Sequence, residues 1–103
     1  MSVADAAALK GRKIRFALVG CGRISGKHVE ALEAHQGSAE LVAVCDSDAA
    51  ALKAMAARTG AKGFRSVEAL LAGSDADVVI VATPSGMHAE QGMLAAAAGR
   101  HVV

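Results

Sequence analysis

Aromatic residues are almost missing from this sequence, and their scarcity restricts how a hydrophobic core can be built. Phenylalanine occurs twice among 103 residues, and tryptophan and tyrosine are absent, although 53% of the residues are hydrophobic. A core of this composition must consist of Ala, Val, Leu, Ile and Met, which suits a buried parallel sheet covered by helices of small residues. At this length we expect at most one compact domain.

Charge imbalance, long apolar runs and cysteine clusters are also lacking. The net charge is +1 and no cluster of Lys or Arg stands out, so we expect no nucleic-acid partner and no membrane partner. No apolar run approaches the roughly 18 residues of a membrane span, and the N-terminus has no signal-peptide pattern. Cys21 and Cys45 lack metal-ligand spacing, so we expect no metal, and reduced thiols in a cytoplasmic protein.

Strand-like and helix-like segments alternate along the rest of the chain, separated by short turns. The predicted strands are residues 14–19, 40–45, 62–64, 77–82 and 100–103. The predicted helices are residues 23–35, 48–60, 66–72 and 87–98. Alternation of this kind implies right-handed crossovers and predicts an α/β protein of the Rossmann type, a doubly wound parallel sheet with strand order 3-2-1-4-5.

Local signals set the expected helix ends and buried faces. Asp48 and Ser66 are well placed to cap the second and third of these helices. In the first helix, Ile24, Ala31 and Leu32 can share an apolar face.

The two ends of the chain differ from the alternating part. Residues 1–12 are rich in alanine, and we expect them to form a loose arm or a frayed helix; residues 13–103 then form the Rossmann domain. The sequence stops inside a strand pattern, so we expect it to be the front part of a longer protein, truncated before a C-terminal substrate domain. An apolar sheet edge left open there favours association, and we expect a homo-oligomer.

Gly20-Cys21-Gly22-Arg23-Ile24-Ser25 lies between a predicted strand and a predicted helix, where a glycine motif has a physical meaning. Gly20 permits a tight turn, and Gly22 lets the backbone approach a pyrophosphate. The N–H groups and the dipole at the helix start favour the phosphate charge. Ser25 takes the third small position, where Gly or Ala is usual. A plain strand-to-helix turn is the alternative.

Asp46 closes the second predicted strand, at about the 20-residue distance beyond the glycines that dinucleotide binding requires. Its carboxylate can accept hydrogen bonds from the hydroxyls of the adenosine ribose. It would repel a 2′-phosphate, and no arginine follows immediately, so NAD is favoured over NADP. The alternative is that Asp46 only begins a turn, but Asp48 is the better helix cap and leaves Asp46 free.

Thr83-Pro84-Ser85 follows the fourth predicted strand, which should lie next to the first. Ligands of such sheets bind outside the carboxyl ends of the strands, where the strand order reverses. This loop should therefore border the nicotinamide half of a dinucleotide. His88, one turn into the next helix, can face the same crevice or serve only in packing.

These segments resemble the N-terminal domain of the glucose-fructose oxidoreductase and inositol dehydrogenase (Gfo/Idh/MocA) family. The similarity lies in residues 14–21, 41–46 and 78–88, including Ala82-Thr83-Pro84, and it extends over nearly all of residues 13–103. Within the family, Ala-Thr-Pro-Ser-Gly-x-His and the preceding Asp-Ala-Asp are most similar to bacterial UDP-N-acetyl-amino-sugar 3-dehydrogenases of surface-polysaccharide synthesis.

The resemblance implies an NAD-dependent oxidoreductase, with NADP less favoured, that acts on a sugar or nucleotide-sugar alcohol. The cofactor contacts that it implies are Gly20, Gly22, Arg23, Ile24, Asp46, Ser66, Thr83, Pro84, Ser85 and His88. The family's Glu-Lys-Pro motif, whose lysine assists proton transfer, would follow the strand that begins at His101, and the sequence ends before it. We therefore expect no catalytic residue in this chain, and cofactor binding without turnover.

Two other functions use similar sequence features. A methyltransferase that binds S-adenosylmethionine can also have a Gly-Cys-Gly turn, but Ile24 stands where its last glycine belongs. A non-catalytic module that senses dinucleotides would use the same fold without chemistry.

Overall fold

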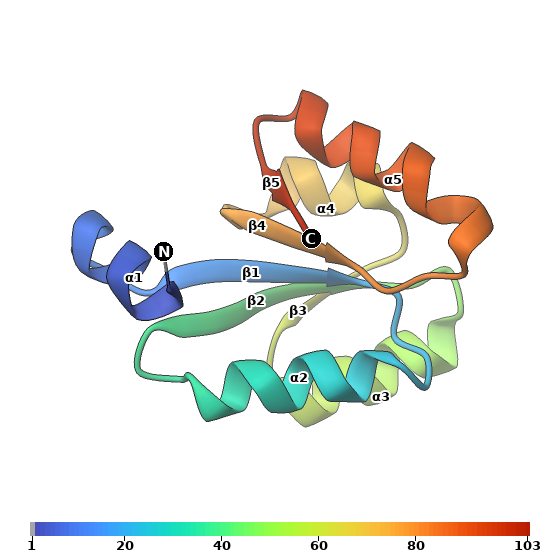
Figure 1. Cartoon of the computed structure of the whole chain (residues 1–103). Helices are drawn as coiled ribbons and strands as arrows, with labels where there is room; N and C mark the ends of the chain where they lie inside the picture. Colours follow the sequence, from blue (N-terminus) through green and yellow to red (C-terminus); the bar gives the residue numbers. More distant parts are fainter. Residues whose placement is uncertain (1) are drawn as a thin grey trace.

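The computed structural model describes residues 2–103, apart from the side chain of Ser85. Five helices and five strands alternate along these residues (Figure 1). The helices are α1 (Val3–Lys10), α2 (Ser25–Ala34), α3 (Ala49–Thr59), α4 (Val67–Gly73) and α5 (Ser85–Ala97). The strands are β1 (Ile14–Val19), β2 (Ala39–Cys45), β3 (Lys62–Phe64), β4 (Val78–Val81) and β5 (His101–Val102).

The five strands form one sheet in the order β3-β2-β1-β4-β5, and every neighbouring pair is parallel. The predicted doubly wound Rossmann sheet is confirmed. In the register of the sheet, Val19 at the end of β1 lies between Cys45 of β2 and Val81 of β4. Because these three strands end level, the residues that follow them emerge side by side at one edge.

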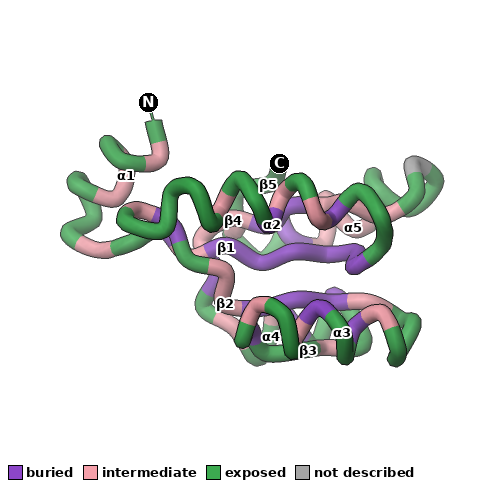
Figure 2. Tube along the Cα trace, turned by 90° about the horizontal axis from the view of Figure 1, so that it is seen from below, coloured by how far each residue is buried: buried purple, intermediate pink, exposed green. Residues whose placement is uncertain are grey.

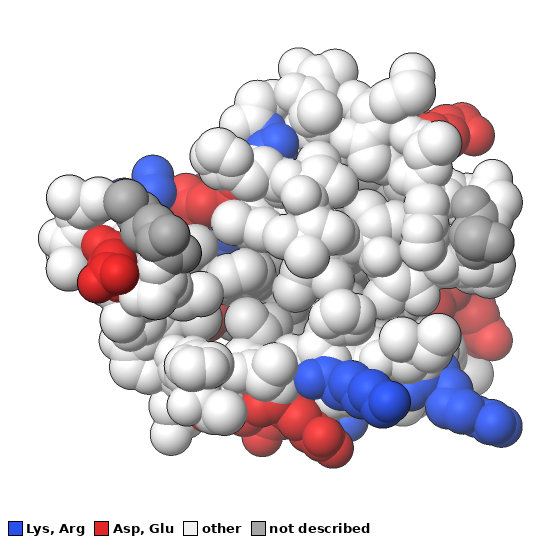
Figure 3. Space-filling model, in the orientation of Figure 1, with Lys and Arg blue, Asp and Glu red and all other residues white. Residues whose placement is uncertain are grey.

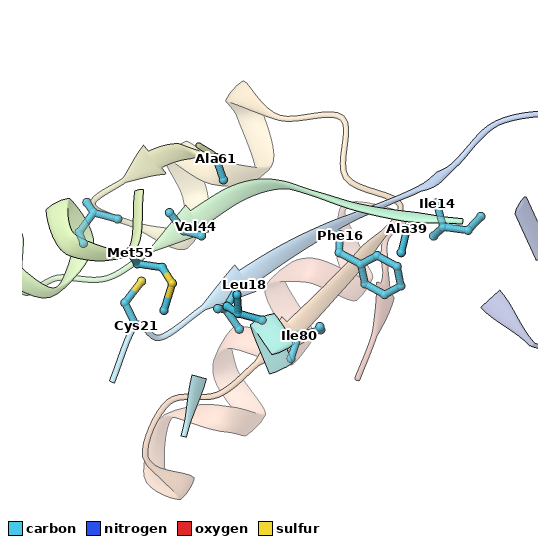
Figure 4. Close-up of a cluster of buried hydrophobic side chains, with 11 residues drawn as sticks. Ile14, Phe16, Leu18, Cys21, Ala39, Val44, Met55, Ala61 and Ile80 are labelled. Atoms are coloured by element: carbon cyan, nitrogen blue, oxygen red, sulfur yellow. The ribbon is translucent and has the colours of Figure 1, made fainter. Parts of the chain in front are cut away.

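Helices cover both faces of the sheet, α2 and α3 on one and α4 and α5 on the other (Figure 1). β1 is buried along nearly its whole length between these layers (Figure 2). Figure 4 shows the core under α2 and α3, in which Phe16, Leu18 and Val44 pack with small and sulfur-containing side chains. Ala17 and Ala43 are fully buried on the opposite face. Ala, Val, Leu, Ile and Met make up most of both cores, as the composition predicted, but Phe16, Cys21 and Cys45 are also buried there.

The predicted helix caps are confirmed. The Asp48 carboxylate accepts hydrogen bonds from the amides of Ala50 and Ala51 at 2.9 and 3.3 Å, and the Ser66 hydroxyl accepts one from Ala69 at 3.1 Å. Satisfying amides that have no partner within the helix sets where α3 and α4 begin.

The predicted apolar face of α2 is confirmed for Leu32 and wrong for Ile24 and Ala31. Ile24 is 67% exposed and Ala31 is exposed, whereas Ser25 and Val29 are buried and Leu32 is partly buried. The spacing expected of a helix is present, but α2 begins at Ser25, whose small side chain fits beneath the glycine turn. The larger Ile24 stays in the turn and points into solvent.

Residues 2–12 are more ordered than the arm we expected. Ser2 and Asp5 form a reciprocal capping box at the start of α1, and Gly11 ends the helix with a φ of 70°. Val3 and Ala6 pack against the core that α2 and α3 also cover. In Figure 1, α1 lies at the end of the sheet where β1 begins, away from the edge where β1, β2 and β4 end.

An ion pair joins this N-terminal segment to the fourth strand. Arg12 binds both carboxylate oxygens of Asp77, at 2.8 and 2.9 Å, and the amide of Arg15 donates to the same carboxylate at 2.9 Å. The hydrogen bonds from Arg12 hold the pKa of Asp77 far below its ordinary value. Asp77 directly precedes β4, so the pair joins α1 to the strand beside β1.

We expect Asp77→Asn to lower the melting temperature at pH 7 by roughly 4–8 °C, the change that a loss of about 1 kcal/mol causes in a domain of this size. A carboxyl whose pKa is lowered by folding contributes its stability above its unfolded pKa of about 3.9. The difference between the two proteins should therefore shrink as the pH falls below about 4. Thermal unfolding followed by circular dichroism from pH 3 to pH 7 measures it.

Asp75→Asn is the matched control. Asp75 also pairs with an arginine, Arg15, but its side chain is 70% exposed, so the change should have little effect. Equal melting temperatures for the two variants at pH 7, or a deficit in Asp77→Asn that does not vary with pH, would contradict this role for Asp77.

Candidate dinucleotide-binding site

A cleft of about 500 Å³ opens at the edge where β1, β2 and β4 end. Its walls come from the turn after β1, the residues after β2 and β3, and the loop that enters α5. Six of the residues predicted to contact a cofactor line it: Gly20, Gly22, Asp46, Ser66, Thr83 and Pro84. These residues are distant in sequence, and the sheet brings them together.

The remaining predicted contacts lie elsewhere or are not described. Arg23 borders a smaller hollow between α2 and α3, and Ile24 points into solvent. His88 is exposed, and its Nε2 contacts the carbonyl of Thr83 beside the cleft. The side chain of Ser85 lies outside the described residues. The cofactor roles of all ten residues stay predictions.

The glycines of the turn have different structural tasks. Gly20 has a φ of 99°, and a Cβ there would lie 2.9 Å from both the carbonyl carbon of Ala82 and the amide nitrogen of Thr83. Gly20 therefore provides a close approach between two backbones as well as the expected tight turn. A Cβ on Gly22 would meet nothing within 4 Å, so this glycine faces open space.

The turn from β1 to α2 also leaves backbone donors available. The amide of Cys21 donates to Asp46, and that of Ser25 donates to the carbonyl of Gly22. Within residues 2–103 the amides of Gly22, Arg23 and Ile24 have no acceptor. Three open N–H groups before a helix start, where the helix dipole is positive, suit a phosphate.

We expected Asp46 to be free, because Asp48 is the better cap. Asp48 does cap α3, but Asp46 also has protein contacts. One of its carboxylate oxygens accepts from the amide of Cys21 at 2.9 Å, and the other accepts from the amide of Asp48 at 2.8 Å. A carboxylate has about four acceptor positions, so it can still accept from ribose hydroxyls. Asp46 thus both ties the glycine turn to β2 and presents a negative charge to the cleft.

Hydrogen bonds also position the loop after β4. The amide of Ala82 donates to the carbonyl of Val19 at 2.8 Å, which keeps the loop beside the glycine turn. The Thr83 hydroxyl is hydrogen-bonded to Oε1 of Gln91, in the second turn of α5. Pro84, with a φ of −53°, directly precedes α5. These contacts hold Thr83 and Pro84 against the cleft.

The two cysteines beside the site are free and buried. Burial, and next the charge of Asp46, raises the pKa of the Cys21 thiol to about 11. Burial also raises the pKa of the Cys45 thiol to about 11, with Cys21, Asp46 and Glu68 adding to the effect. Figure 4 shows Cys21 among the apolar side chains of the core, beside Met55. Both thiols stay protonated near neutral pH, and both pack in the hydrophobic cores.

The cleft has further residues that the sequence analysis did not identify, among them Arg65, Glu68, Met87 and Gln91. Arg65 follows β3 directly, and the carboxyl end of a parallel strand is a sufficient signal for such a residue. Our expectation considered only arginines immediately after Asp46, and it missed one that the neighbouring strand supplies.

The sequence profile described as "Oxidoreductase family, NAD-binding Rossmann fold", GFO_IDH_MocA, matches residues 14–103. The chain belongs to the Gfo/Idh/MocA family. This membership confirms the predicted resemblance and the prediction of NAD as cofactor, and it excludes the methyltransferase alternative. The family match begins at Ile14, so it includes the whole sheet and leaves α1 outside.

Known members share this fold over most of the chain. The WlbA dehydrogenase from Chromobacterium violaceum, solved in complex with NADH and UDP-GlcNAcA, is 58% identical with a TM-score of 0.87, over 88% of this chain and 26% of that one. Inositol 2-dehydrogenase from Rhizobium meliloti is 39% identical over 75% of this chain and 23% of its own length. KijD10, a 3-ketoreductase from Actinomadura kijaniata solved with NADP and TDP-benzene, is 32% identical with a TM-score of 0.81, over 89% of this chain and 28% of that one.

The chain thus spans about a quarter of the length of these Gfo/Idh/MocA relatives. Within the described residues, no helix is long and apolar enough to cross a membrane.

We expect Gly20→Ala to lower the free energy of unfolding by about 2 kcal/mol or more, because its positive φ and the backbone of Ala82 both oppose a side chain. Gly26→Ala is the control. Gly26 lies in α2, and its added Cβ would come no closer than 3.8 Å to a side-chain atom of Arg58. This change should raise stability by about 0.5–1 kcal/mol. Urea unfolding measures both, and wild-type stability in Gly20→Ala would contradict the close approach.

We also expect both thiols to resist alkylation and aromatic disulfide reagents in the folded protein. At pH 8 a thiol with a pKa of about 11 is ionised in about one molecule in a thousand, so reaction should be more than about 100-fold slower than for a free cysteine. In guanidinium, two thiols should react rapidly. A thiol of the folded chain that reacts at the free-cysteine rate would show that Cys21 or Cys45 is accessible and ionised.

Proposed function

We propose that this chain binds the dinucleotide of an NAD-dependent dehydrogenase that acts on a hydroxyl group of a sugar or nucleotide sugar. The observation that carries the proposal is the position of the Asp46 carboxylate, which lines one cleft together with Gly20 and Gly22. An anion site made of amides and an acceptor for hydroxyls then lie in the order that an adenosine diphosphate requires.

Each part of the cleft takes one part of the dinucleotide in this proposal. The open amides of Gly22, Arg23 and Ile24 bind the diphosphate, and Gly22 allows it to approach the backbone. Asp46 accepts hydrogen bonds from the adenosine ribose, and Ser66 lies toward the adenine.

The loop after β4 takes the other end. Thr83 and Pro84, with Ser85 and His88 beside them, border the nicotinamide ring and its ribose. When bound, the nicotinamide supplies hydride transfer at its C4 atom. The residues of this chain orient the dinucleotide and shield it from water. The chemistry that we assign to them is cofactor binding, without a catalytic acid or base.

The relatives support a substrate class for this proposal. WlbA, at 58% identity, was solved with a UDP-linked sugar acid, which supports a UDP-N-acetyl-amino-sugar as the substrate of the full-length protein. Turnover of such a sugar with NAD by the full-length protein, followed by NADH absorbance, tests this.

We further propose a cytoplasmic homo-oligomer; two unpaired cysteines fit a reducing compartment.

The decisive experiment for this chain is calorimetric titration with NADH. Asp46→Ala should weaken NADH binding by about 10- to 100-fold, because it removes hydrogen bonds between hydroxyls and a charged group. Asp48→Asn should leave the affinity within about twofold, since asparagine also caps helices well. Circular dichroism checks that both variants are folded. Absence of NADH binding by the wild-type chain, or unchanged affinity in Asp46→Ala, would overturn the proposal.

A further inference from the structure

Arg65 is a cationic side chain in the wall of the cleft that the proposed contacts leave unused. It directly follows β3 and lines the same cleft as Asp46. Its Nη2 donates a hydrogen bond of 2.8 Å to the carbonyl of Ser47, the residue after Asp46. This bond directs the guanidinium toward the segment that presents the Asp46 carboxylate.

The sheet register explains why residues so distant in sequence meet. Cys45 of β2 pairs with Phe64 of β3, and the amide of Asp46 donates to the carbonyl of Phe64 at 3.2 Å. Asp46 and Arg65 are therefore the first residues beyond the ends of two adjacent, paired strands. A negative and a positive side chain follow neighbouring strands at the same level of the sheet.

The charge of Arg65 is not neutralised by an ion pair within residues 2–103. A guanidinium has five N–H donors in a planar arrangement, and the bond to Ser47 occupies one of them. The remaining donors can take a phosphate in the bidentate geometry that arginine favours. On the face seen in Figure 3, Lys and Arg side chains gather along the lower right edge, and Asp and Glu side chains are scattered.

We propose that Arg65 sets the specificity of the site at the 2′ position of the adenosine ribose. Asp46 accepts from a 2′-hydroxyl and repels a 2′-phosphate; Arg65 donates to a 2′-phosphate and offsets that repulsion. The site therefore prefers the dinucleotide with a free hydroxyl but retains measurable affinity for the 2′-phosphorylated form. This rests on the proposed function, since it concerns the adenosine end of the same cleft.

The test is the binding of NADH and NADPH to the chain and four variants, measured by titration at one fixed salt concentration. Arg65→Ala should weaken NADPH about tenfold, the effect of a lost charge-assisted bond, and NADH by less than about threefold. Asp46→Asn should strengthen NADPH binding about tenfold, since it removes the like charge. In the double variant Asp46→Asn with Arg65→Ala that gain should disappear. Lys53→Ala, which removes the same charge from α3 outside the cleft, should alter neither affinity by more than about twofold.

The outcomes separate this inference from the proposed function. The proposed function stands if the wild-type chain binds NADH and Asp46→Ala weakens that binding. If Arg65→Ala then changes the affinities for NADH and NADPH by the same factor, only the role of Arg65 is overturned. A double variant that keeps the full NADPH gain overturns the role of Arg65 as well. Binding of neither dinucleotide by the wild-type chain overturns both.

Discussion

The hydrogen bond from the Cys21 amide to the Asp46 carboxylate is the interaction on which this site depends. It joins the turn after β1 to the residue that closes β2, and so it places a donor-rich backbone and a carboxylate at a fixed separation. The other oxygen of the same carboxylate accepts a hydrogen bond from the amide of Asp48, at the start of α3. One side chain therefore organises the turn, the strand end and the following helix before any ligand is present.

Most element ends could be predicted from the sequence because the signals are local, and the strand order followed from the alternation of strands and helices. The bounds of β1 agree with the apolar run that ends at Gly20, and Asp48 and Ser66 act as caps through bonds within three residues. These features depend on short-range chemistry, in which the residue type and its neighbours are enough. The cleft followed too, since parallel strands must end at a common edge.

What could not be predicted depends on packing between distant segments. The buried face of α2 is set by where the helix begins under the turn, and a change of one position exchanges Ile24 for Ser25 and Val29. The second task of Gly20 requires knowing that the backbone of Ala82 passes beside it. The end of β3 signals Arg65 as a residue of the sheet edge, but its position beside Asp46 depends on the pairing of β2 with β3. The N-terminal segment is joined to the sheet by the bond of Arg12 to Asp77, which lies far along the chain.

The contact between Gly20 and the backbone of Ala82 and Thr83 has a consequence for how ligands of different length are distinguished. The turn after β1 and the loop beyond β4 approach each other through main-chain atoms, which cannot rotate away as side chains can. The distance between the two halves of the cleft is thus held fixed by the backbone. In the proposed function a dinucleotide gains contacts from both halves at this fixed distance, whereas a mononucleotide gains them from one half.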